Sequence, residues 1–537
     1  MLRIRLISLL TIAASFLAGI NAAELPRATA ASQGIDELGL MNFIDTLRTL
    51  PNTQIHHLMV VRHGRVVAEA HPSPFAAEDT HTLYSCSKTV TALAVGIAAD
   101  KGLLNVTDKV VSFFPDKVPS DADPRLSEVT VKHLLTMTSG IKNNPLTRER
   151  YNDWVLGWLE RGMAAEPGTD WEYDTMSTFM LSAIVQKVTG MKLLDFLNEN
   201  LFTPIGITEA DWEESPDGTN CGGWGLRLKT ESQAKLGVLL LNYGKWDGRQ
   251  LVSRKWIEEM TSEQFRNYVP KPDIPKTAIG KIKYYIKLAW AHIKSWFTGK
   301  EPELVKFWEA YGYQTKILHH PTFEAFFAIG LNGQTIYMNR ERDLVVVING
   351  STPGYGSAFK AIWSVLFPAC LPQPRGDSGL ESDIMAHLQS LDHKPVSGEL
   401  FNTNEKQYTG KKTHRLAGNE MNVRTFAVSI ADSVCTLTIT DEAENTAVIP
   451  CGYGKWLTSS NSCPPPYDMK ALNALAGLHG EWKVAGSYAW TGPHTLSISL
   501  NYVNWVTHRD IKLDFWNDEI TIQDNFNPET SQTVLFN

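Results

Sequence analysis

The chain has 537 residues, which is too long for a single hydrophobic core and predicts about two to four domains. Its apolar content of 43% and aromatic content of 10% are those of an ordinary globular protein, which excludes a fibre or a disordered chain. With 50 Lys and Arg against 58 Asp and Glu, the formal net charge is −8. The charge therefore gives no electrostatic support for a nucleic-acid partner.

Residues 1–23 have the form of a cleavable secretory signal. Arg3 and Arg5 precede an apolar run over 6–20, and small residues follow at Asn21-Ala22-Ala23. The run is too short and too weakly flanked to favour a retained membrane anchor. We therefore expect an exported protein, either secreted or periplasmic.

Two local patterns come next in the chain. Asp36 is expected to cap a helix whose apolar residues recur at helical intervals, at Leu40, Phe43, Ile44, Leu47 and Leu50. Segments 57–62 and 65–69 are then expected to form two strands, joined by a tight turn at His63-Gly64.

A serine and a lysine three residues apart follow this hairpin. Ser85 and Lys88 begin a segment that continues as the apolar stretch 89–96. Residues three apart on a helix share a face, so the amine can reach the hydroxyl. A serine hydroxyl is a poor nucleophile until a neighbouring base takes its proton, and Ser-x-x-Lys occurs in acyl-transfer serine enzymes. Taken alone, the pattern also fits an N-capped surface helix with a solvated lysine.

The rest of the first part of the chain predicts one layered structure. A helix-rich stretch runs to about residue 202 and includes 130–138, which Ser139-Gly140 is expected to end. Strand-like segments return at 314–318, 325–329, 335–338 and 344–348, and helical spacing reappears at 359–366. Strands at both ends with helices between them predict an α+β fold in which the first and last parts share a sheet.

The composition changes after this region. Residues 372–395 are polar with scattered prolines, which is typical of a linker. Beyond them, apolar and polar residues alternate over short segments, at 426–430, 436–440, 496–500, 511–515 and 520–522. This period of two predicts an all-β domain. The expected domains are thus 24–371, a linker at 372–395, and a C-terminal β-rich domain at 396–537.

The six cysteines are too sparse to form a disulfide framework, and no pair has metal-ligand spacing. We expect neither a metal nor a cofactor. Cys451 and Cys463 bracket a short loop containing Gly and Ser, and they are the expected bridge. Cys435 and Cys370 are the rival partners, and buried free thiols are the alternative.

Four motifs occur in order along the chain, at Arg62-His63-Gly64-Arg65, Ser85-x-x-Lys88, His133 to Gly140, and Gly330-Leu331-Asn332-Gly333-Gln334. Together they resemble the serine β-lactamase-like hydrolases over roughly residues 55–367. The similarity is closest to the class C-related branch, which includes esterases, 6-aminohexanoate-dimer hydrolases and D-aminopeptidases. The resemblance implies a β-lactamase/transpeptidase-like antiparallel sheet flanked by helices, with the C-terminal all-β domain as an extension carried by some members.

The resemblance also implies roles for particular residues. Ser85 matches the nucleophile, and Lys88 matches the amine that helps to deprotonate it. Tyr173, within Trp171-Glu172-Tyr173-Asp174-Thr175, matches the tyrosine that shuttles protons. A nearby cation favours the phenolate and lowers the pKa of such a tyrosine.

The fourth motif is expected to complete an oxyanion hole with the backbone amide of Ser85. If Gly330 matches the glycine of the family motif, the second amide is that of Leu331; if Gly333 does, it is that of Gln334. Asn332 and Gly333 are expected to line the substrate, as is Thr175.

Two departures from the family pattern bear on the substrate. An apolar residue, Ala328 or Leu331, stands where β-lactamases and D-Ala-D-Ala peptidases place a lysine or histidine, and Thr175 replaces an asparagine. These changes remove a cation suited to a carboxylate and an amide suited to a carbonyl.

We therefore expect an exported serine hydrolase that cleaves a small-molecule ester or amide through a Ser85 acyl-enzyme. A D-Ala-D-Ala peptidase or β-lactamase is one alternative, and a non-catalytic binding protein on the same fold is the other.

Segment 279–297 is expected to cover the active site. Its apolar residues recur at helical spacing, and its charged residues are lysines: Ile282, Ile286, Trp290, Ile293 and Phe297 against Lys281, Lys283, Lys287 and Lys294. A movable lid of this kind excludes water from the reacting centre. Contact with a membrane surface is one alternative, and a helix packed permanently on its own domain is the other.

Overall fold

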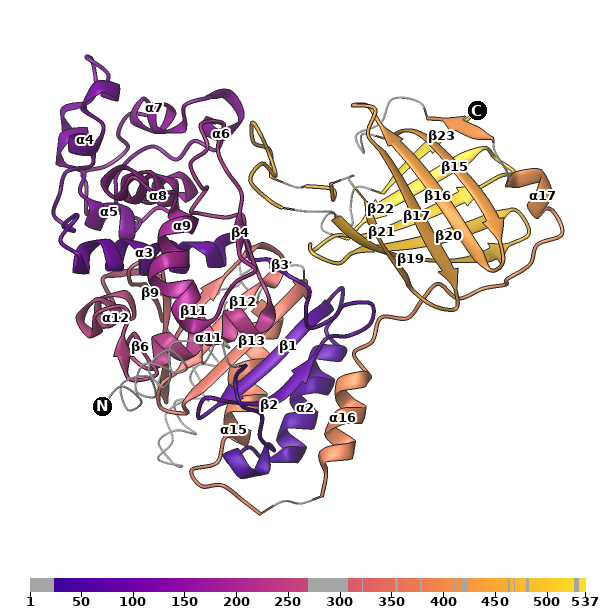
Figure 1. The fold of residues 1–537 in the computed structure, drawn as a ribbon, viewed down its shortest axis with the longest axis horizontal. Coiled ribbons are helices and arrows are strands. Elements are labelled where there is room, and N and C mark those ends of the chain that lie inside the picture. The colour runs from indigo at the N-terminus through magenta and orange to yellow at the C-terminus, as the bar shows by residue number, and fades with distance from the viewer. Residues whose placement is uncertain are drawn as a thin grey trace, which may run out of the picture.

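Figure 1 shows a computed structural model in which a mixed α/β body is joined to a separate, curled β domain. The structure describes residues 24–268, 308–320, 322–352, 356–376, 379–409, 412–416, 423–461, 464–467, 469–479, 482–525 and 531–537. Segment 279–297, the expected lid, lies outside these residues. Within the described ranges, no helix is both long enough and apolar enough to cross a bilayer.

The main body is built on one antiparallel sheet. Its strands, in spatial order, are β2 (Arg65–Ala70), β1 (Gln54–Arg62), β13 (Leu344–Ser351), β12 (Thr335–Asn339), β11 (Phe323–Ile329), β10 (Lys316–His320), β9 (Trp308–Tyr311) and β8 (Phe265–Tyr268). Leu58 of β1 pairs with Ile348 of β13, so the early and late parts of this body share the sheet as predicted. Strands β8 and β9 extend it beyond the predicted strands.

Helices cover both faces of this sheet because its side chains alternate between two apolar cores. Met59 and Val61 of β1 belong to one core, whereas Leu58 and Val60 belong to the other. The second core is covered by α2 (Glu37–Arg48), α14 (Gly356–Ala361), α15 (Phe367–Ala369) and α16 (Glu381–Gln389). The first core is covered by a helical layer that includes α3 (Ser87–Asp100), α5 (Val131–Leu135), α7 (Trp154–Leu159), α8 (Thr175–Thr189), α9 (Leu193–Leu197), α11 (Thr230–Leu241) and α12 (Arg254–Met260).

Shorter elements connect these layers. The helical ones are α4 (Val110–Phe113), α6 (Thr147–Arg150) and α10 (Thr203–Ile205). A small sheet has the order β3 (His81–Thr82), β5 (Leu226–Leu228) and β4 (Asp211–Trp212), and a hairpin pairs β6 (Lys245–Trp246) with β7 (Arg249–Gln250).

The first helix and the segment after the sheet test two local predictions. The Asp36 side chain accepts the Gly39 amide at 3.0 Å, so α2 has the predicted cap. Residues 372–395, expected as a linker, instead contain α16. Its residues Ile384 and Leu388 are buried in the same core as α2, because apolar side chains at helical spacing outweigh the surrounding polar and proline residues.

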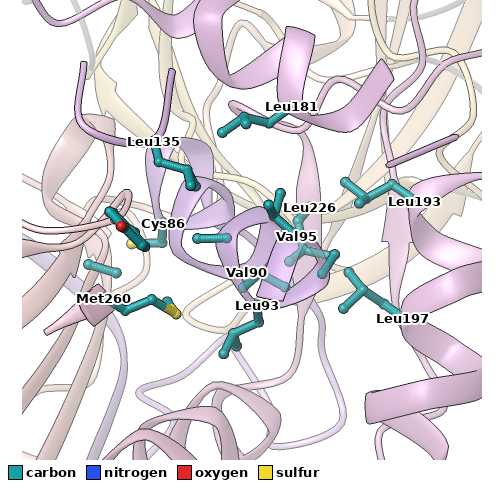
Figure 2. Close-up of a cluster of buried hydrophobic side chains, with 14 of the residues drawn as sticks. Cys86, Val90, Leu93, Val95, Leu135, Leu181, Leu193, Leu197, Leu226 and Met260 are labelled. Carbon is teal, nitrogen blue, oxygen red and sulfur yellow. The ribbon is translucent and has the colours of Figure 1, made fainter. Parts of the chain in front are cut away.

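Helix α3 is the central helix of the body. Its residues 87–98 are all buried, and Figure 2 shows Val90, Leu93 and Val95 of this helix among apolar side chains from other elements, such as Leu135 and Leu181. Gly96 allows a close crossing, since a Cβ there would lie 2.3 Å from the Trp256 ring. Ser85 and Lys88 therefore stand at the start of a helix that is held rigidly by its surroundings.

The C-terminal domain is a curled all-β sheet, which confirms the predicted class. Its strands are β14 (Thr413–Arg415), β15 (Val423–Ala431), β16 (Val434–Asp441), β17 (Thr446–Tyr453), β18 (Leu457–Asn461), β19 (Trp482–Gly492), β20 (Thr495–Tyr502), β21 (His508–Asp514), β22 (Glu519–Asp524) and β23 (Gln532–Leu535). Helix α17 (Glu405–Tyr408) precedes them. All pairings are antiparallel except that of β17 with β19.

The cysteines of this domain bear on the predicted bridge. Cys451 of β17 lies directly opposite Cys435 of β16, and both thiols are free and buried. Cys463 lies outside the described residues, so the Cys451–Cys463 bridge stays a prediction. The register of β16 and β17 therefore brings Cys451 together with Cys435, its rival partner.

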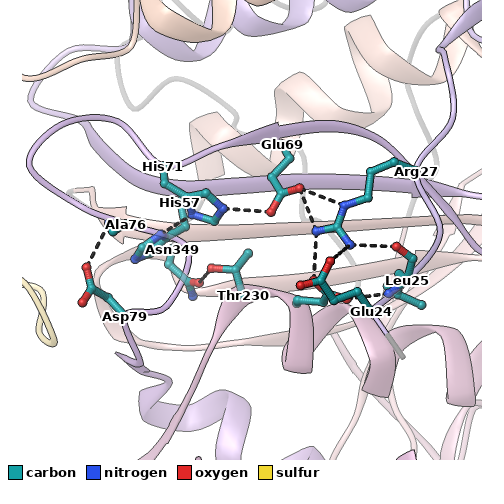
Figure 3. Close-up of polar contacts among 11 residues, drawn as sticks. Glu24, Leu25, Arg27, His57, Glu69, His71, Ala76, Asp79, Thr230 and Asn349 are labelled. Carbon is teal, nitrogen blue, oxygen red and sulfur yellow. Dashed lines mark hydrogen bonds and ion pairs between the residues drawn. The ribbon is translucent and has the colours of Figure 1, made fainter. Parts of the chain in front are cut away.

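A group of histidines is buried beside β1. The Nδ1 atom of His56 lies 3.0 Å from Nε2 of His81, and Nδ1 of His57 lies 2.8 Å from Nδ1 of His71. Figure 3 shows His71 hydrogen-bonded to the Glu69 carboxylate, which also accepts a bond from Arg27. Burial lowers the pKa of His56 and His57 well below the ordinary value and that of His81 to about 4, so these rings are neutral at pH 7.

Candidate active site

Ser85 and Lys88 meet at the N-terminal end of α3. The Lys88 Nζ lies 3.0 Å from the Ser85 Oγ and donates a second hydrogen bond, of 2.7 Å, to the Gly223 carbonyl. Ser85 is half-buried, whereas the Lys88 side chain is 1% exposed. Ser85 is thus partly accessible to solvent, while the lysine that bonds its hydroxyl is sealed inside the protein.

This burial changes the acid–base chemistry of the lysine. Removal from water disfavours the ammonium and lowers the pKa of Lys88 to about 7, with a smaller contribution in the same direction from Arg148. Asp174 and Cys86 act in the opposite direction. A large fraction of Lys88 is therefore a neutral amine near pH 7, which is the form that can accept a proton.

Tyr173 lies on the other side of the lysine. The Lys88 Nζ is 4.9 Å from the centroid of the Tyr173 ring. Tyr173 is held by its neighbour Asp174, which caps α8 and accepts bonds from Arg161 at 3.0 Å and Ser177 at 2.7 Å. The structure thus brings Ser85, Lys88 and Tyr173 together.

The motif from His133 to Gly140 binds the backbone next to Tyr173. Met137 has a positive φ of 59°, a conformation that turns the chain sharply after α5. Its carbonyl accepts the Glu172 amide at 2.9 Å. The Asn143 amide then donates to the Tyr173 carbonyl at 3.1 Å. This turn fixes the backbone on both sides of Tyr173.

The sequence did not single out one part of the site, the loop 220–225, which we call the glycine loop. It lies between α3 and α8, where Thr91 donates to the Gly222 carbonyl and Lys88 to the Gly223 carbonyl. A Cβ at Gly223 would lie 2.7 Å from the Thr175 carbonyl oxygen. The signal was three glycines in the five residues 221–225, a pattern that permits close backbone approach.

The fourth motif lies at the end of β11, beside the residues that precede Ser85. A Cβ at Gly330 would lie 2.3 Å from the Leu83 carbonyl oxygen and 3.2 Å from the Tyr84 Cβ. Leu331 is 48% exposed, whereas Gln334 is fully buried. The Gln334 side chain donates to the Gly350 carbonyl at 2.7 Å and so binds β13. Gly330 and Leu331 are therefore the part of this motif next to Ser85.

The remaining residues expected at the site have other contacts. Gly333 packs against the Thr352 side chain, and the Asn332 carbonyl accepts the Thr352 amide at 3.1 Å, so this part of the turn faces β13. Thr175 begins α8 and contacts Gly223. Among the described residues, no group of three His, Cys, Asp or Glu side chains is placed to hold a metal ion.

Comparison with known proteins defines the class. The model of the beta-lactamase family matches residues 56–366, more than half of the chain. The chain belongs to the beta-lactamase family, and its mixed body has the β-lactamase/transpeptidase-like fold that the motifs predicted. At this level the protein is a hydrolase of the serine β-lactamase type.

Individual relatives are more distant. The 6-aminohexanoate-dimer hydrolase of Paenarthrobacter ureafaciens is 24% identical over 339 residues, which cover 58% of this chain and 76% of the relative. Penicillin-binding protein 4* of Bacillus subtilis is 28% identical over 153 residues, covering 25% of this chain and 31% of that protein. The structure of a penicillin-binding protein homologue from Caulobacter crescentus aligns with a TM-score of 0.47 at 15% identity, covering 62% of this chain and 97% of the homologue.

Proposed function

We propose that this protein cleaves an ester or amide of a small molecule through an acyl-enzyme on Ser85. The observation that carries the proposal is the 3.0 Å contact between the Ser85 hydroxyl and a sealed lysine whose pKa is lowered to about 7. A neutral amine in contact with a hydroxyl is the arrangement that activates a serine nucleophile.

In the proposed reaction, the Lys88 amine takes the proton of the Ser85 hydroxyl while Oγ bonds to the substrate carbonyl carbon. The negative charge moves to the carbonyl oxygen. When the tetrahedral intermediate collapses, the bond to the leaving group breaks and the leaving group takes a proton through Tyr173, which lies against Lys88. Water then attacks the acyl carbon and gives one proton to the Lys88 amine, the bond between the acyl carbon and Ser85 Oγ breaks, Oγ takes that proton from Lys88, and the acid product leaves.

For the oxyanion hole, we favour the amides of Ser85 and Leu331 over that of Gln334. Gly330 packs directly on Leu83 and Tyr84, which brings the following amide next to the nucleophile. Gln334 is buried, its carbonyl accepts the Gly330 amide at 2.8 Å, and its side chain binds β13. Backbone donors placed beside the nucleophile stabilise the charge that develops on the substrate oxygen.

The substrate we propose has no carboxylate at its recognition end. Of the two positions that replace the family's cation, Ala328 is buried in the core, whereas the Leu331 side chain reaches solvent. An apolar side chain at this exposed position suits an uncharged acyl group. Small acyl esters should therefore react far better than a β-lactam or a D-Ala-D-Ala peptide, and Leu331→Lys should narrow that difference.

The location remains a proposal that rests on the pattern at 1–23 alone. Contact of 279–297 with a membrane surface, or its closure over the site, likewise stays a prediction from the sequence.

The test is a panel of short esters, amides, nitrocefin and a D-Ala-D-Ala peptide, with wild type, Ser85→Ala and the control Ser112→Ala. Ser112 is an exposed serine of the same body, whose hydroxyl donates to the Lys109 carbonyl. We expect ester or amide turnover and fluorophosphonate labelling in wild type and Ser112→Ala, and neither in Ser85→Ala.

Normal turnover by folded Ser85→Ala would refute the proposed mechanism. Comparable efficiency on nitrocefin or the peptide would favour the β-lactamase or peptidase alternative. A wild type without turnover or labelling would favour the non-catalytic one.

A further inference from the structure

The C-terminal domain reaches the main body through residues 464–467 and 469–479, which we call the interdomain segment. Figure 1 shows it as a gold loop that leaves the curled sheet and lies beside α6 and β4. Arg148 of α6 donates through Nε to the Lys470 carbonyl at 2.8 Å, and its own carbonyl accepts the Leu472 amide at 2.7 Å. The His479 amide donates to Asp211 of β4 at 2.9 Å. Directional bonds thus fix the segment on the main body.

Glu213, the residue after β4, is the buried centre of this contact. Both of its carboxylate oxygens are bonded by the interdomain segment: the Tyr467 hydroxyl donates at 2.7 Å and the Leu475 amide at 3.1 Å. The Glu213 side chain is fully buried. Burial raises its pKa to about 7, and the bonds from Tyr467 and Leu475 act in the opposite direction. A buried carboxyl group needs such donors, so its position depends on them.

The backbone of Glu213 holds both ends of the glycine loop. Its amide donates to the Gly225 carbonyl at 3.0 Å, and its carbonyl accepts the Cys221 amide at 2.8 Å. Between these two bonds lies Gly223, whose carbonyl accepts the bond from Lys88. A Cβ at Gly225 would lie 2.4 Å from the Glu213 Cβ, so the glycine loop packs tightly against Glu213. A displacement of Glu213 therefore moves the carbonyl that orients Lys88.

A second contact leads from the same domain to Ser85. Tyr84, directly before the nucleophile, has a positive φ of 43°, which is strained for a residue with a bulky side chain. Its buried ring belongs to the apolar core of the C-terminal domain and meets the Trp505 ring edge-on, at 6.1 Å between centroids. Trp505 in turn contacts Tyr467, at 5.5 Å. The domain thus touches the residue next to Ser85 directly, and it reaches the glycine loop beside Lys88 through Glu213.

We propose that Tyr467 and Glu213 are positioning residues for catalysis, through which the C-terminal β domain holds the Gly223 carbonyl against Lys88. This inference rests on the proposed hydrolase function. It gives the β domain a part in assembling the active site rather than in binding a separate ligand.

The test compares Tyr467→Phe with Tyr408→Phe in the full chain. Tyr408 is a matched control because its hydroxyl bonds His494 at 2.6 Å, with both partners inside the C-terminal domain. We expect kcat for the best ester to fall on the order of 10-fold in Tyr467→Phe, since loss of a bond to a buried carboxylate lets the glycine loop shift. Tyr408→Phe should keep the wild-type kcat even if its melting temperature falls equally.

A second readout separates positioning from folding. Lys88 is faced by Tyr173, Asp174, Cys86 and Arg148, and burial is the largest cause of its lowered pKa. A loosened loop admits water to Lys88, so the acidic limb of kcat/KM should move to higher pH in Tyr467→Phe. The limb should stay in place in the control.

A double variant tests the route through the carboxylate. If Tyr467 acts through Glu213, adding Tyr467→Phe to Glu213→Gln should lower kcat no further than the more damaging single change. Multiplied losses would overturn this route. An active wild type with an unchanged kcat and pH profile in Tyr467→Phe would overturn the inference and leave the hydrolase intact. A wild type without Ser85-dependent turnover would overturn both.

Discussion

Replacing Lys88 by methionine should abolish labelling of Ser85 and, at the same time, stabilise the folded protein at neutral pH. Methionine fills a similar volume without a charge. In the unfolded chain, Lys88 has the ordinary lysine pKa of 10.5, and folding lowers it to about 7. Because each pKa unit corresponds to about 1.4 kcal/mol, burying this lysine costs about 5 kcal/mol at pH 7. The Gly223 carbonyl loses its donor in the variant, which costs about 1–3 kcal/mol. The net gain for Lys88→Met is then about 2–4 kcal/mol.

The sign of this effect depends on pH. Between pH 7 and 10.5 the unfolded wild type holds a proton that the folded wild type does not, so raising the pH favours the folded wild type. The variant has no such proton. The advantage of Lys88→Met should therefore shrink by about 2 kcal/mol between pH 7 and pH 9, approaching about 1.4 kcal/mol per pH unit once folded Lys88 is fully neutral.

The assay is urea unfolding at both pH values, with hydrogen exchange of α3 peptides as a reporter of the main body. Lys101→Met is the matched control, because Lys101 lies exposed at the end of the same helix, where methionine replaces no buried amine. A difference between Lys88→Met and wild type that stays constant from pH 7 to pH 9 would refute the reasoning.

Three further outcomes are expected. Tyr173→Phe should lower kcat on the order of 10²-fold or more with the fold retained, because the leaving group loses its proton path; near-normal turnover would exclude that role. Gly223→Ala should lower kcat strongly, since its Cβ would lie 2.7 Å from the Thr175 carbonyl oxygen, whereas Gly376→Ala meets nothing within 4 Å and should be neutral in the same ester assay. The pKa of His81 is lowered to about 4 in the fold, so its contribution to stability is present above about pH 6.5 and lost as the pH falls towards 4. The melting temperature should fall over that range, and His81→Gln should flatten the decline.

Local sequence patterns predicted much of the fold. The Asp36 cap, the hairpin of β1 and β2, and the central strands β11 to β13 all follow from caps, turns and periodicity within a few residues. Helix α16 was not predicted from such local patterns. Its apolar residues are few, and the flanking prolines and polar residues dominate the composition of 372–395.

The candidate site likewise has parts that the sequence predicted and parts that it did not. The structure places Ser85, Lys88 and Tyr173 together, as the family motifs implied, although their catalytic roles stay predictions. The contact of Gly223 with Lys88 could not be read from the sequence, because a backbone carbonyl has no side-chain signature and the two residues lie far apart in the chain. The hydrogen bond between Tyr467 and Glu213 could not be predicted from the sequence either, since it depends on how the interdomain segment lies on the main body.

The pairing of β1 with β13 determines when during synthesis the enzyme site can exist. Ser85 emerges from the ribosome before residues 344–351, and strand 54–62 has no partner on that side of the sheet until those residues have also emerged. The Gly330–Leu331 turn lies just before this late strand, and the Tyr467 contact comes later still. A growing chain therefore carries Ser85 and Lys88 without these surroundings until residues 344–351 have been made. The contact of the glycine loop with the C-terminal domain forms only after Tyr467 has also been made.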